Sequence, residues 1–272
     1  MHDSQERGAV TRAPAELFDL TGKVALVTGG SRGLGREIVL AFAAAGADVV
    51  IASRKLDACE AVAAEVEALG RRALPIAAHV GDWDGLATLA DTAWNWQGHV
   101  DILVNNAGLS PLAPSPHETS EALFDKVVDI NFKGPFRLTA LIGQRMAQGS
   151  GGSIINVSSS GALTPAASIG PYAGAKAGLN AMSMAMAMAY APKVRVNILS
   201  PGTFRTDIST AWADDPNMGV DIALGRIGEP PEIVTSALYL ASAASSYTTG
   251  SLIRVDGAGP IPIGAKRQIT SK

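Results

Sequence analysis

The chain is poor in cysteine, in aromatic residues and in charge of either sign. Cys59 is the only cysteine among 272 residues, which excludes an internal disulfide and a thiolate metal cluster. Aromatic residues make up 5% and charged residues 17% of the sequence, and the net charge of −3 comes without a basic run. We therefore expect no nucleic-acid partner, because phosphate backbones are bound by clustered Lys and Arg side chains.

Long apolar runs and metal-binding spacings are also missing. No stretch approaches the roughly 18 apolar residues that a membrane-spanning helix requires, and residues 1–15 have no apolar core of signal-peptide length. None of the four histidines has the close spacing of a metal-binding motif (His2, His79, His99 and His117). These absences predict a soluble, cytoplasmic protein with no metal site and no membrane partner.

The chain does contain a regular alternation of strand-like and helix-like runs. Candidate strands lie at 23–28, 47–52, 73–78, 100–104, 152–157, 193–199 and 251–255, and helical patterns at about 33–45, 55–69, 83–96, 119–148, 172–190 and 230–242. This alternation is typical of βαβ units, in which helices cover both faces of a parallel sheet. It predicts a single-domain α/β fold, a Rossmann-like doubly wound sheet of about seven strands.

The predicted domain spans residues 19–259, with no linker or shift in composition inside it. Residues 1–18 are expected to form a loose N-terminal arm, and residues 260–272 a C-terminal tail. The longest irregular stretch, at about 201–224, holds Phe204, Trp212 and Met218. A long segment of this kind in a compact domain favours a substrate lid over disorder.

The first strand runs directly into a glycine-rich turn. Val24 to Val27 are apolar, Gly29, Gly33 and Gly35 follow, and a helical pattern begins there. Such a turn directs backbone N–H groups and a helix N-terminus at one point, which suits a pyrophosphate. A tight bend without a ligand is the alternative, and the turn alone does not decide between them.

A tyrosine and a lysine lie four residues apart at the start of a later helix. Tyr172 and Lys176 therefore share one helix face, and the serine run 158–160 follows the strand before them. A phenol with a pKa near 10 is a poor acid or base at neutral pH, and a nearby ammonium lowers that pKa by Coulomb attraction. The spacing arises by chance on many helices, so its weight comes from the strand end that precedes it.

Six short motifs follow one another along the chain in a characteristic order and spacing. They are Thr28-Gly29-xxx-Gly33-x-Gly35, Asn105-Asn106-Ala107-Gly108, Asn131, Ser159, Tyr172-xxx-Lys176 and Pro201-Gly202-xxx-Thr206. With these motifs the chain resembles the short-chain dehydrogenase/reductase family, of the single-domain type of about 250 residues, over residues 20–258. The runs 51–54 and 201–206 look most like gluconate 5-dehydrogenase and 3-oxoacyl-[acyl-carrier-protein] reductase relatives, and they do not separate those two substrates.

The resemblance implies a role for each matching residue. Tyr172 exchanges a proton with the substrate oxygen, Ser159 hydrogen-bonds that oxygen, and Lys176 lowers the tyrosine pKa and binds the nicotinamide ribose. Asn131 holds, through its backbone, a water that links Lys176 to solvent. The implied cofactor-binding residues are Gly29, Ser31, Arg32, Gly33, Leu34, Gly35, Ser53, Arg54, Val80, Asn106, Ala107, Gly108, Tyr172, Lys176, Pro201, Gly202, Thr203 and Thr206.

The choice of cofactor follows from a missing carboxylate. A site selective for NAD carries Asp or Glu on the ribose about 20 residues after the glycine turn, but the strand here ends in Ser53-Arg54. Asp48 lies at the wrong end of that strand. Arg54 and Arg32 can instead form a fork around a 2′-phosphate, which predicts NADP(H). His79 stands where the family often has aspartate, and its role stays open.

The predicted helix at 172–190 is apolar on all sides because methionine alternates with alanine over residues 181–189. A helix apolar all round has to be buried on both sides. We therefore expect a homotetramer or a homodimer, with this helix at a subunit interface as in relatives.

These features together predict an NADP(H)-dependent oxidoreductase that interconverts a secondary alcohol and a ketone, both small molecules. Two other functions stay open: a non-catalytic NADP(H)-binding regulatory protein on the same fold, and epimerase or dehydratase chemistry on a sugar nucleotide. Arg205 could pair with a substrate carboxylate, although a solvent-facing position is favoured.

Overall fold

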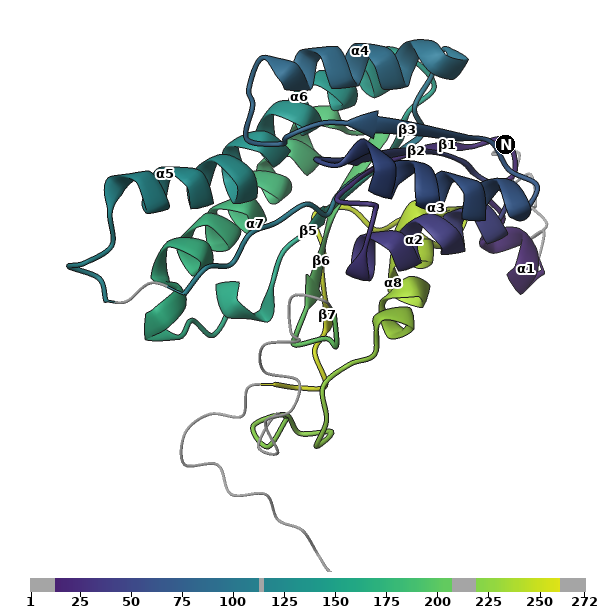
Figure 1. Cartoon of the computed structure of the whole chain (residues 1–272). Helices are drawn as coiled ribbons and strands as arrows, with labels where there is room; N and C mark the ends of the chain where they lie inside the picture. Colours follow the sequence, from purple (N-terminus) through teal and green to yellow (C-terminus); the bar gives the residue numbers. More distant parts are fainter. Residues whose placement is uncertain (1–12, 113–114, 207–218, 260–272) are drawn as a thin grey trace, which may run out of the picture.

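The predicted strands form one parallel sheet (Figure 1). The computed structural model describes residues 13–112, 115–206 and 219–259, and within them the sheet has seven strands in the order β3-β2-β1-β4-β5-β6-β7. They are β1 (Val24–Thr28), β2 (Asp48–Ser53), β3 (Ala73–Ala77), β4 (Ile102–Asn105), β5 (Gly152–Val157), β6 (Val194–Pro201) and β7 (Leu252–Val255). The central strands are short apolar runs because helices cover both of their faces.

Two helical layers bury these faces (Figure 1). The helices are α1 (Pro14–Leu17), α2 (Gly33–Ala44), α3 (Leu56–Ala68), α4 (Gly85–Gln97), α5 (Glu121–Val128), α6 (Gly134–Gln148), α7 (Gly170–Tyr190) and α8 (Val234–Ala241). Alternate residues of β1 face opposite layers: Val27 lies in a core with α2, α3 and α8, and Leu26 lies in a core with α4, α6 and α7. Burying each such side chain contributes about 1.5–3 kcal/mol to stability.

The chain changes direction across the sheet at β1. This strand pairs with β2 on one side and with β4 on the other, all in parallel register. In doubly wound sheets, ligands bind outside the carboxyl ends of the strands at such a switch point. The topology therefore places a binding crevice beside the glycine turn.

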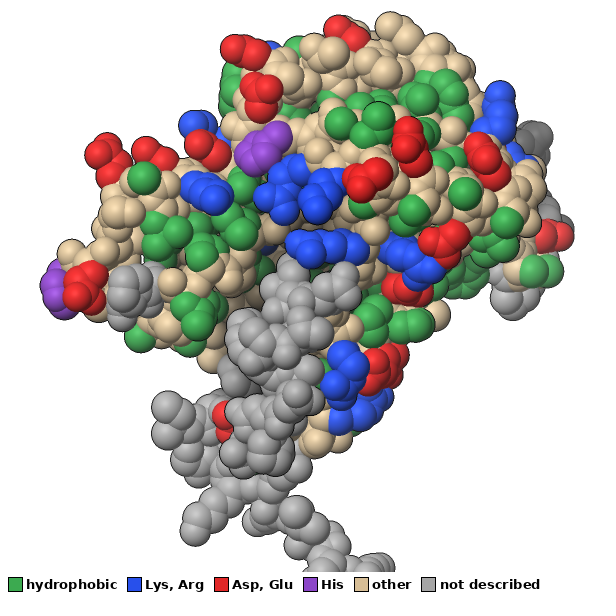
Figure 2. Space-filling model, viewed as in Figure 1, with side chains coloured by type: hydrophobic (Ala, Val, Ile, Leu, Met, Phe, Trp, Pro, Cys, Tyr) green, Lys and Arg blue, Asp and Glu red, His purple; other side chains and the backbone are tan. Residues whose placement is uncertain are grey.

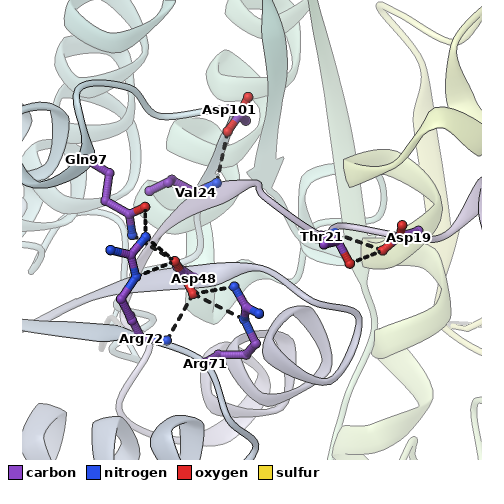
Figure 3. A network of polar contacts seen from close by, with 8 residues as sticks. All are labelled: Asp19, Thr21, Val24, Asp48, Arg71, Arg72, Gln97 and Asp101. Carbon is purple, nitrogen blue, oxygen red and sulfur yellow. Dashed lines mark hydrogen bonds and ion pairs between the residues drawn. The ribbon is translucent and has the colours of Figure 1, made fainter.

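A polar cluster lies at the amino ends of the strands, on the side of the sheet opposite the crevice (Figure 3). The Asp48 carboxylate accepts hydrogen bonds from the Arg71 and Arg72 guanidinium groups, each at 2.8 Å, and from the Gln97 amide at 3.0 Å. Burial by itself raises the pKa of Asp48, but these bonds and one from the Arg72 backbone outweigh it and lower the pKa to about 2. Asp48 is thus engaged far from the crevice, as its position in the sequence predicts.

The middle helix differs from its prediction. The sequence predicts one helix over 119–148, but α5 and α6 are separated by a π-helical turn at Asp129–Lys133. The predicted helix at 230–242 begins as a 3₁₀ turn, Pro230–Ile233, before α8. Both differences arise where the backbone changes its hydrogen-bond register, which a side-chain pattern does not report.

The predicted arm, lid and tail are only partly described. One helical turn, α1, forms inside the predicted arm, where Pro14 at the first position favours a helix start. In the predicted lid, Phe204 is buried. Residues 1–12, 207–218 and 260–272, with Trp212 and Met218 among them, lie outside the described residues.

Candidate active site

A cavity of about 940 Å³ opens at the carboxyl ends of the strands. Residues from the turns after β1, β2 and β3 line one end of it, residues after β4 and β5 line the middle, and residues after β6 and β7 line the rest, with Thr206 beside the turn after β1. Figure 2 shows Lys and Arg side chains gathered at the middle of one face of the molecule, with a histidine beside them. Most residues implied by the motifs meet at this cavity.

The glycine turn has the close backbone packing that a phosphate cradle needs. Gly29 and Gly33 have φ of +65° and +53°, in the left-handed region that favours glycine. A Cβ on Gly35 would lie 2.1 Å from the Gly29 carbonyl oxygen, so only glycine fits there. A Cβ on Gly33 would meet only Thr206, at 3.5 Å. The turn therefore brings the N-terminus of α2 and the segment after β6 to one point.

The asparagine motif holds this turn in place. Asn106 Nδ2 donates to the carbonyl oxygens of Thr28 at 3.1 Å and Gly29 at 3.2 Å. In return, Thr28 Oγ1 accepts from the backbone N–H groups of Asn106 and Ala107. Asn106, Ala107 and Gly108 also line the cavity. Their role in the structure is both to line the site and to fix the glycine turn.

Two arginines lie at the β1–β3 end of the cavity. Arg32 and Arg54 line it and are exposed, and neither makes an ion pair or a side-chain hydrogen bond with the residues that the structure describes. Ser53 lines the cavity, whereas Ser31 does not and bonds Ser53 through its hydroxyl at 3.0 Å. The site thus has free guanidinium groups and no carboxylate at this end, which fits a 2′-phosphate.

The two residues after β3 also face this end. Val80 and His79 both line the cavity, so His79 points inward rather than into solvent alone. The His79 Nδ1 atom accepts the backbone N–H of Gly81 at 3.2 Å. This bond leaves Nε2 as the nitrogen available to a ligand.

Ser159, Tyr172 and Lys176 meet at the middle of the cavity. The Lys176 side chain is buried, its Nζ donates to the Val157 carbonyl at 2.8 Å, and Nζ lies 6.0 Å from the centroid of the Tyr172 ring. Ser159 hydrogen-bonds the Tyr172 phenol, and its hydroxyl also accepts the Gly161 N–H at 3.1 Å. The helical spacing and the end of β5 therefore converge as the sequence predicts.

Burial shifts both ionisable groups toward their neutral forms. It lowers the pKa of Lys176 to about 7 and raises the pKa of Tyr172, against a smaller lowering by the Ser159 hydrogen bond. The sequence predicts a lowered tyrosine pKa, and the structure gives the opposite direction. The reason is desolvation: the packing that brings the two side chains together disfavours the ammonium and the phenolate alike.

Asn131 lies behind the cavity wall and not in it. This fully buried residue of the π-helical turn donates to the carbonyl oxygens of Leu109 at 2.8 Å and Val127 at 2.9 Å, and its Oδ1 accepts the Leu109 N–H at 3.2 Å. A Cβ on Gly108 would lie 3.2 Å from Asn131 Oδ1 and 3.7 Å from Lys176 Nζ. The Asn131 side chain thus fixes the loop after β4 next to the lysine.

The structure adds residues that the sequence interpretation missed. Of the predicted cofactor residues, all line the cavity except Ser31 and Pro201, which is buried at the end of β6. The missed lining residues include Leu109, Ser110, Pro111, Ile169, Phe204, Gly219, Asp221, Ile222, Ile227, Asp256 and Gly259. Most are apolar or small residues in loops, and only the irregular composition of 201–224 pointed toward part of this set.

Comparisons with known proteins identify the family. A family model described as short chain dehydrogenase matches residues 23–217. The chain is 38% identical over 250 residues to 2-dehydro-3-deoxy-D-gluconate 5-dehydrogenase of Pseudoalteromonas atlantica, covering 89% of this chain and 97% of that protein. The chain therefore belongs to the short-chain dehydrogenase family, which is a family of oxidoreductases.

Solved structures agree with this assignment. The gluconate 5-dehydrogenase of Burkholderia cenocepacia, in complex with NADP and tartrate, is 29% identical with a TM-score of 0.85, covering 90% of this chain and 98% of that one. A 7α-hydroxysteroid dehydrogenase with NADH and 7-oxo glycochenodeoxycholic acid is 32% identical with a TM-score of 0.86, covering 92% and 98%. These two proteins carry different nicotinamide cofactors and different second ligands.

The described part of the chain contains neither a candidate membrane-spanning helix nor a candidate metal site. None of its helices is both long enough and apolar enough to cross a membrane. None of its groups of His, Cys, Asp and Glu side chains could hold a metal ion.

Proposed function

We propose that the protein is an NADP(H)-dependent oxidoreductase that interconverts a secondary alcohol and a ketone. One observation carries the proposal: Ser159, Tyr172 and Lys176 line the same cavity as a glycine turn and two free arginines. The cofactor, when bound, supplies the hydride that the carbonyl carbon accepts and takes it back in the reverse direction. The protein positions the substrate and supplies the proton.

The side chains at the middle of the cavity divide the proton transfer between them. In reduction, the Ser159 hydroxyl donates a hydrogen bond to the carbonyl oxygen, and the Tyr172 phenol gives that oxygen its proton. The protonated form of Lys176 stabilises the phenolate that results. Because its pKa is about 7, Lys176 can take up and release a proton near neutral pH, and we assign its link to solvent to a water held by the Asn131 backbone.

The positive charges at the β1–β3 end of the cavity favour NADP(H) over NAD(H). We assign the 2′-phosphate to Arg32 and Arg54, and the pyrophosphate to the glycine turn with Thr206. The NADP of the Burkholderia enzyme and the NADH of the hydroxysteroid dehydrogenase show that relatives differ in cofactor. The free arginines, and the absence of a carboxylate after β2, support NADP(H) for this chain.

The proposal extends to the state of the protein in solution. We infer a homotetramer or a homodimer in the cytoplasm. Exposed methionines on α7 support the assembly, because Met184 and Met188 are 44% and 78% exposed in the single chain. A single cysteine fits a reducing compartment.

Replacing the phenol tests the catalytic assignment. Turnover with NADPH and NADP⁺ is measured at 340 nm on a panel of ketones and secondary alcohols, and cofactor binding is measured by titration of NADPH fluorescence. We expect Tyr172→Phe to lower kcat about 10²–10⁴-fold while NADPH affinity changes little, because only the proton donor is lost. Tyr247→Phe, at a fully exposed tyrosine, is the matched control. A Tyr172→Phe enzyme with near-normal kcat would refute the mechanism.

A further inference from the structure

We propose that the substrate is a bulky, apolar and uncharged ketone or secondary alcohol, and that Asp221 disfavours anionic substrates. This inference rests on the proposed function and names the substrate class of the same cavity. It also distinguishes between the substrate types of the two solved relatives, since sugar acids always carry a carboxylate and alicyclic ketones need not.

The strand order locates the substrate end of the cavity. Arg32 and Arg54 follow β1 and β2, Tyr172 and Lys176 lie beyond β5, and β6 and β7 come next in the sheet. A dinucleotide that extends from the arginines, past the glycine turn and Thr206, to Lys176 leaves the part of the cavity around Ile222 and Ile227 to the substrate. This part is lined from the segments after β6 and β7, with Asp221 among them.

The walls of the substrate end are apolar. Phe204, Ile222 and Ile227 are buried and line it on the side of β6 and β7. On the other side, Ile169 lies close to the catalytic ring, since a Cβ on Gly161 would be 2.9 Å from Ile169 Cδ1 and 3.9 Å from Tyr172 Cε1. A polyhydroxylated substrate would lose its hydrogen bonds to water against such walls, which disfavours it.

Apolar side chains also stand exposed next to the lining residues. Leu112, Leu163, Val220 and Leu224 are between 43% and 70% exposed, and each lies within two residues of a residue that lines the cavity. Leu224 belongs to the same wall, because its N–H donates to the Gly257 carbonyl at 3.2 Å, beside Ile222. Exposed apolar residues gathered at a cavity are typical of a site for a large apolar ligand.

Among the described residues, the cations near this end are already paired, and none of them lines the cavity. Arg205 binds Glu229 at 3.1 Å, Arg226 binds Glu232 at 2.7 Å, and Arg254 binds Asp256 at 2.5 Å. The only cation at the middle of the cavity among the described residues is Lys176, which the mechanism uses. A substrate carboxylate therefore finds no free positive group in this part of the described chain.

The Asp221 carboxylate would also repel an anionic substrate. Its exposed carboxylate lines the cavity and makes no ion pair with a described residue, whereas the neighbouring Asp256 is neutralised by Arg254. A carboxylate on the substrate would face the Asp221 charge without a counter-ion, and like charges that lose water repel strongly. Arg205 is paired with Glu229 and does not line the cavity, which disfavours a contact between Arg205 and a substrate carboxylate.

The test compares ketones that differ in charge. The values of kcat/KM with NADPH are measured for 2-decalone, for the same bicyclic ketone bearing a carboxylate, and for 5-keto-D-gluconate. We expect 2-decalone to be reduced at least tenfold more efficiently than either anion. Asp221→Asn is expected to narrow the ratio between decalone and its carboxylate at least threefold. Asp57→Asn, the same change at an exposed helix residue that does not line the cavity, is expected to leave the ratio unchanged.

The outcomes separate the inference from the function on which it rests. Equal or better use of either anion overturns the substrate class and leaves the oxidoreductase assignment standing. Turnover of other ketones of the panel without turnover of decalone also overturns the substrate class alone, whereas binding of NADPH without turnover of any ketone or alcohol overturns both. A protein that binds no NADPH overturns both.

Discussion

At the scale of single residues, Arg32 and Arg54 differ from the other described arginines. The others hold carboxylates, carbonyl oxygens or an aromatic ring within the protein; they are Arg36, Arg71, Arg72, Arg137, Arg145, Arg195, Arg205, Arg226 and Arg254. A guanidinium group that is already paired adds little to ligand binding, whereas a free one gives charge-assisted bonds to phosphate. The free pair therefore dominates the expected cofactor preference.

Replacing Arg54 tests this preference. We expect the wild type to bind NADPH at least tenfold more tightly than NADH, which corresponds to about 1.4 kcal/mol. Arg54→Asp is expected to narrow or reverse the ratio, because the variant puts a carboxylate near the 2′ position. Fluorescence titration gives both affinities. Lys55→Asp is the control for the same charge change one residue away, and an unchanged ratio in Arg54→Asp would remove Arg54 from the site.

The Lys176 ammonium links stability to pH. Its pKa is about 7 in the folded chain and near 10.4 in an unfolded one. Between these values the unfolded chain binds more protons, so the free energy of unfolding from this group rises with pH, by up to about 1.4 kcal/mol per unit. Below pH 7 both states are protonated and this slope vanishes.

Denaturant unfolding at pH 7, 8 and 9 checks the slope. We expect Lys176→Met to remove a rise that the wild type and the exposed-lysine control Lys55→Met both keep. Identical slopes in Lys176→Met and wild type would show that another group causes the rise.

At the scale of helices and strands, the sequence predicts regular elements well and irregular ones poorly. The strand predicted at 23–28 is β1 (Val24–Thr28), since a strand buried on both faces gives a short apolar run. The π-helical turn at Asp129–Lys133 leaves no such trace, because apolar residues continue on either side of it. Yet this turn places Asn131 against the loop after β4.

The same contrast holds for the site. Tyr172 and Lys176 could be placed together from their spacing on one helix, and Ser159 from the strand end before them. The raised pKa of Tyr172 could not be predicted, since it follows from burial of the phenol itself, which the spacing does not give. The pair of Arg205 and Glu229 joins residues brought together by the segment after β6, so only the folded chain shows it.

The Asp48 cluster joins β2, the turn before β3 and α4 at the amino ends of the strands. We expect Asp48→Asn to lower the free energy of unfolding by about 2 kcal/mol, because two guanidinium groups lose their shared carboxylate. NADPH affinity should stay unchanged, since the cluster lies at the edge opposite the cavity. Denaturant unfolding and NADPH titration measure the two effects. Glu60→Gln, at an exposed residue of α3, is the control. Since the pKa of Asp48 is lowered to about 2, its contribution is present above pH 4 and lost as the pH falls through 2.

At the scale of the whole molecule, one helical layer exposes several large apolar side chains in the single chain. Met184 and Met188 on α7 are exposed, and so are Phe124 on α5 and Phe136 on α6. The helices α5 and α6 both pack against α7. Large apolar side chains exposed on neighbouring helices of one layer favour a protein–protein interface there.

Light scattering at micromolar concentration tests the assembly. We expect a dimer or a tetramer, and we expect Met188→Glu to dissociate it, because an interface disfavours an unpaired buried carboxylate. Leu69→Glu places the same charge on an exposed apolar residue at the end of α3 and should leave the assembly intact. A stable wild-type monomer of about 28 kDa would contradict this prediction.

The order of the strands has a consequence for how such a protein changes over generations. Arg32 and Arg54, which we assign to the 2′-phosphate, follow β1 and β2, whereas Asp221 and Ile222, which we assign to the substrate end, lie in the segment after β6, toward the other end of the sheet. Distant sites of this kind contribute to binding almost additively. Mutations at the substrate end, beyond Thr206, can therefore retarget a duplicated copy to new substrates while the inherited cofactor, and the metabolic redox pool to which it belongs, stays the same.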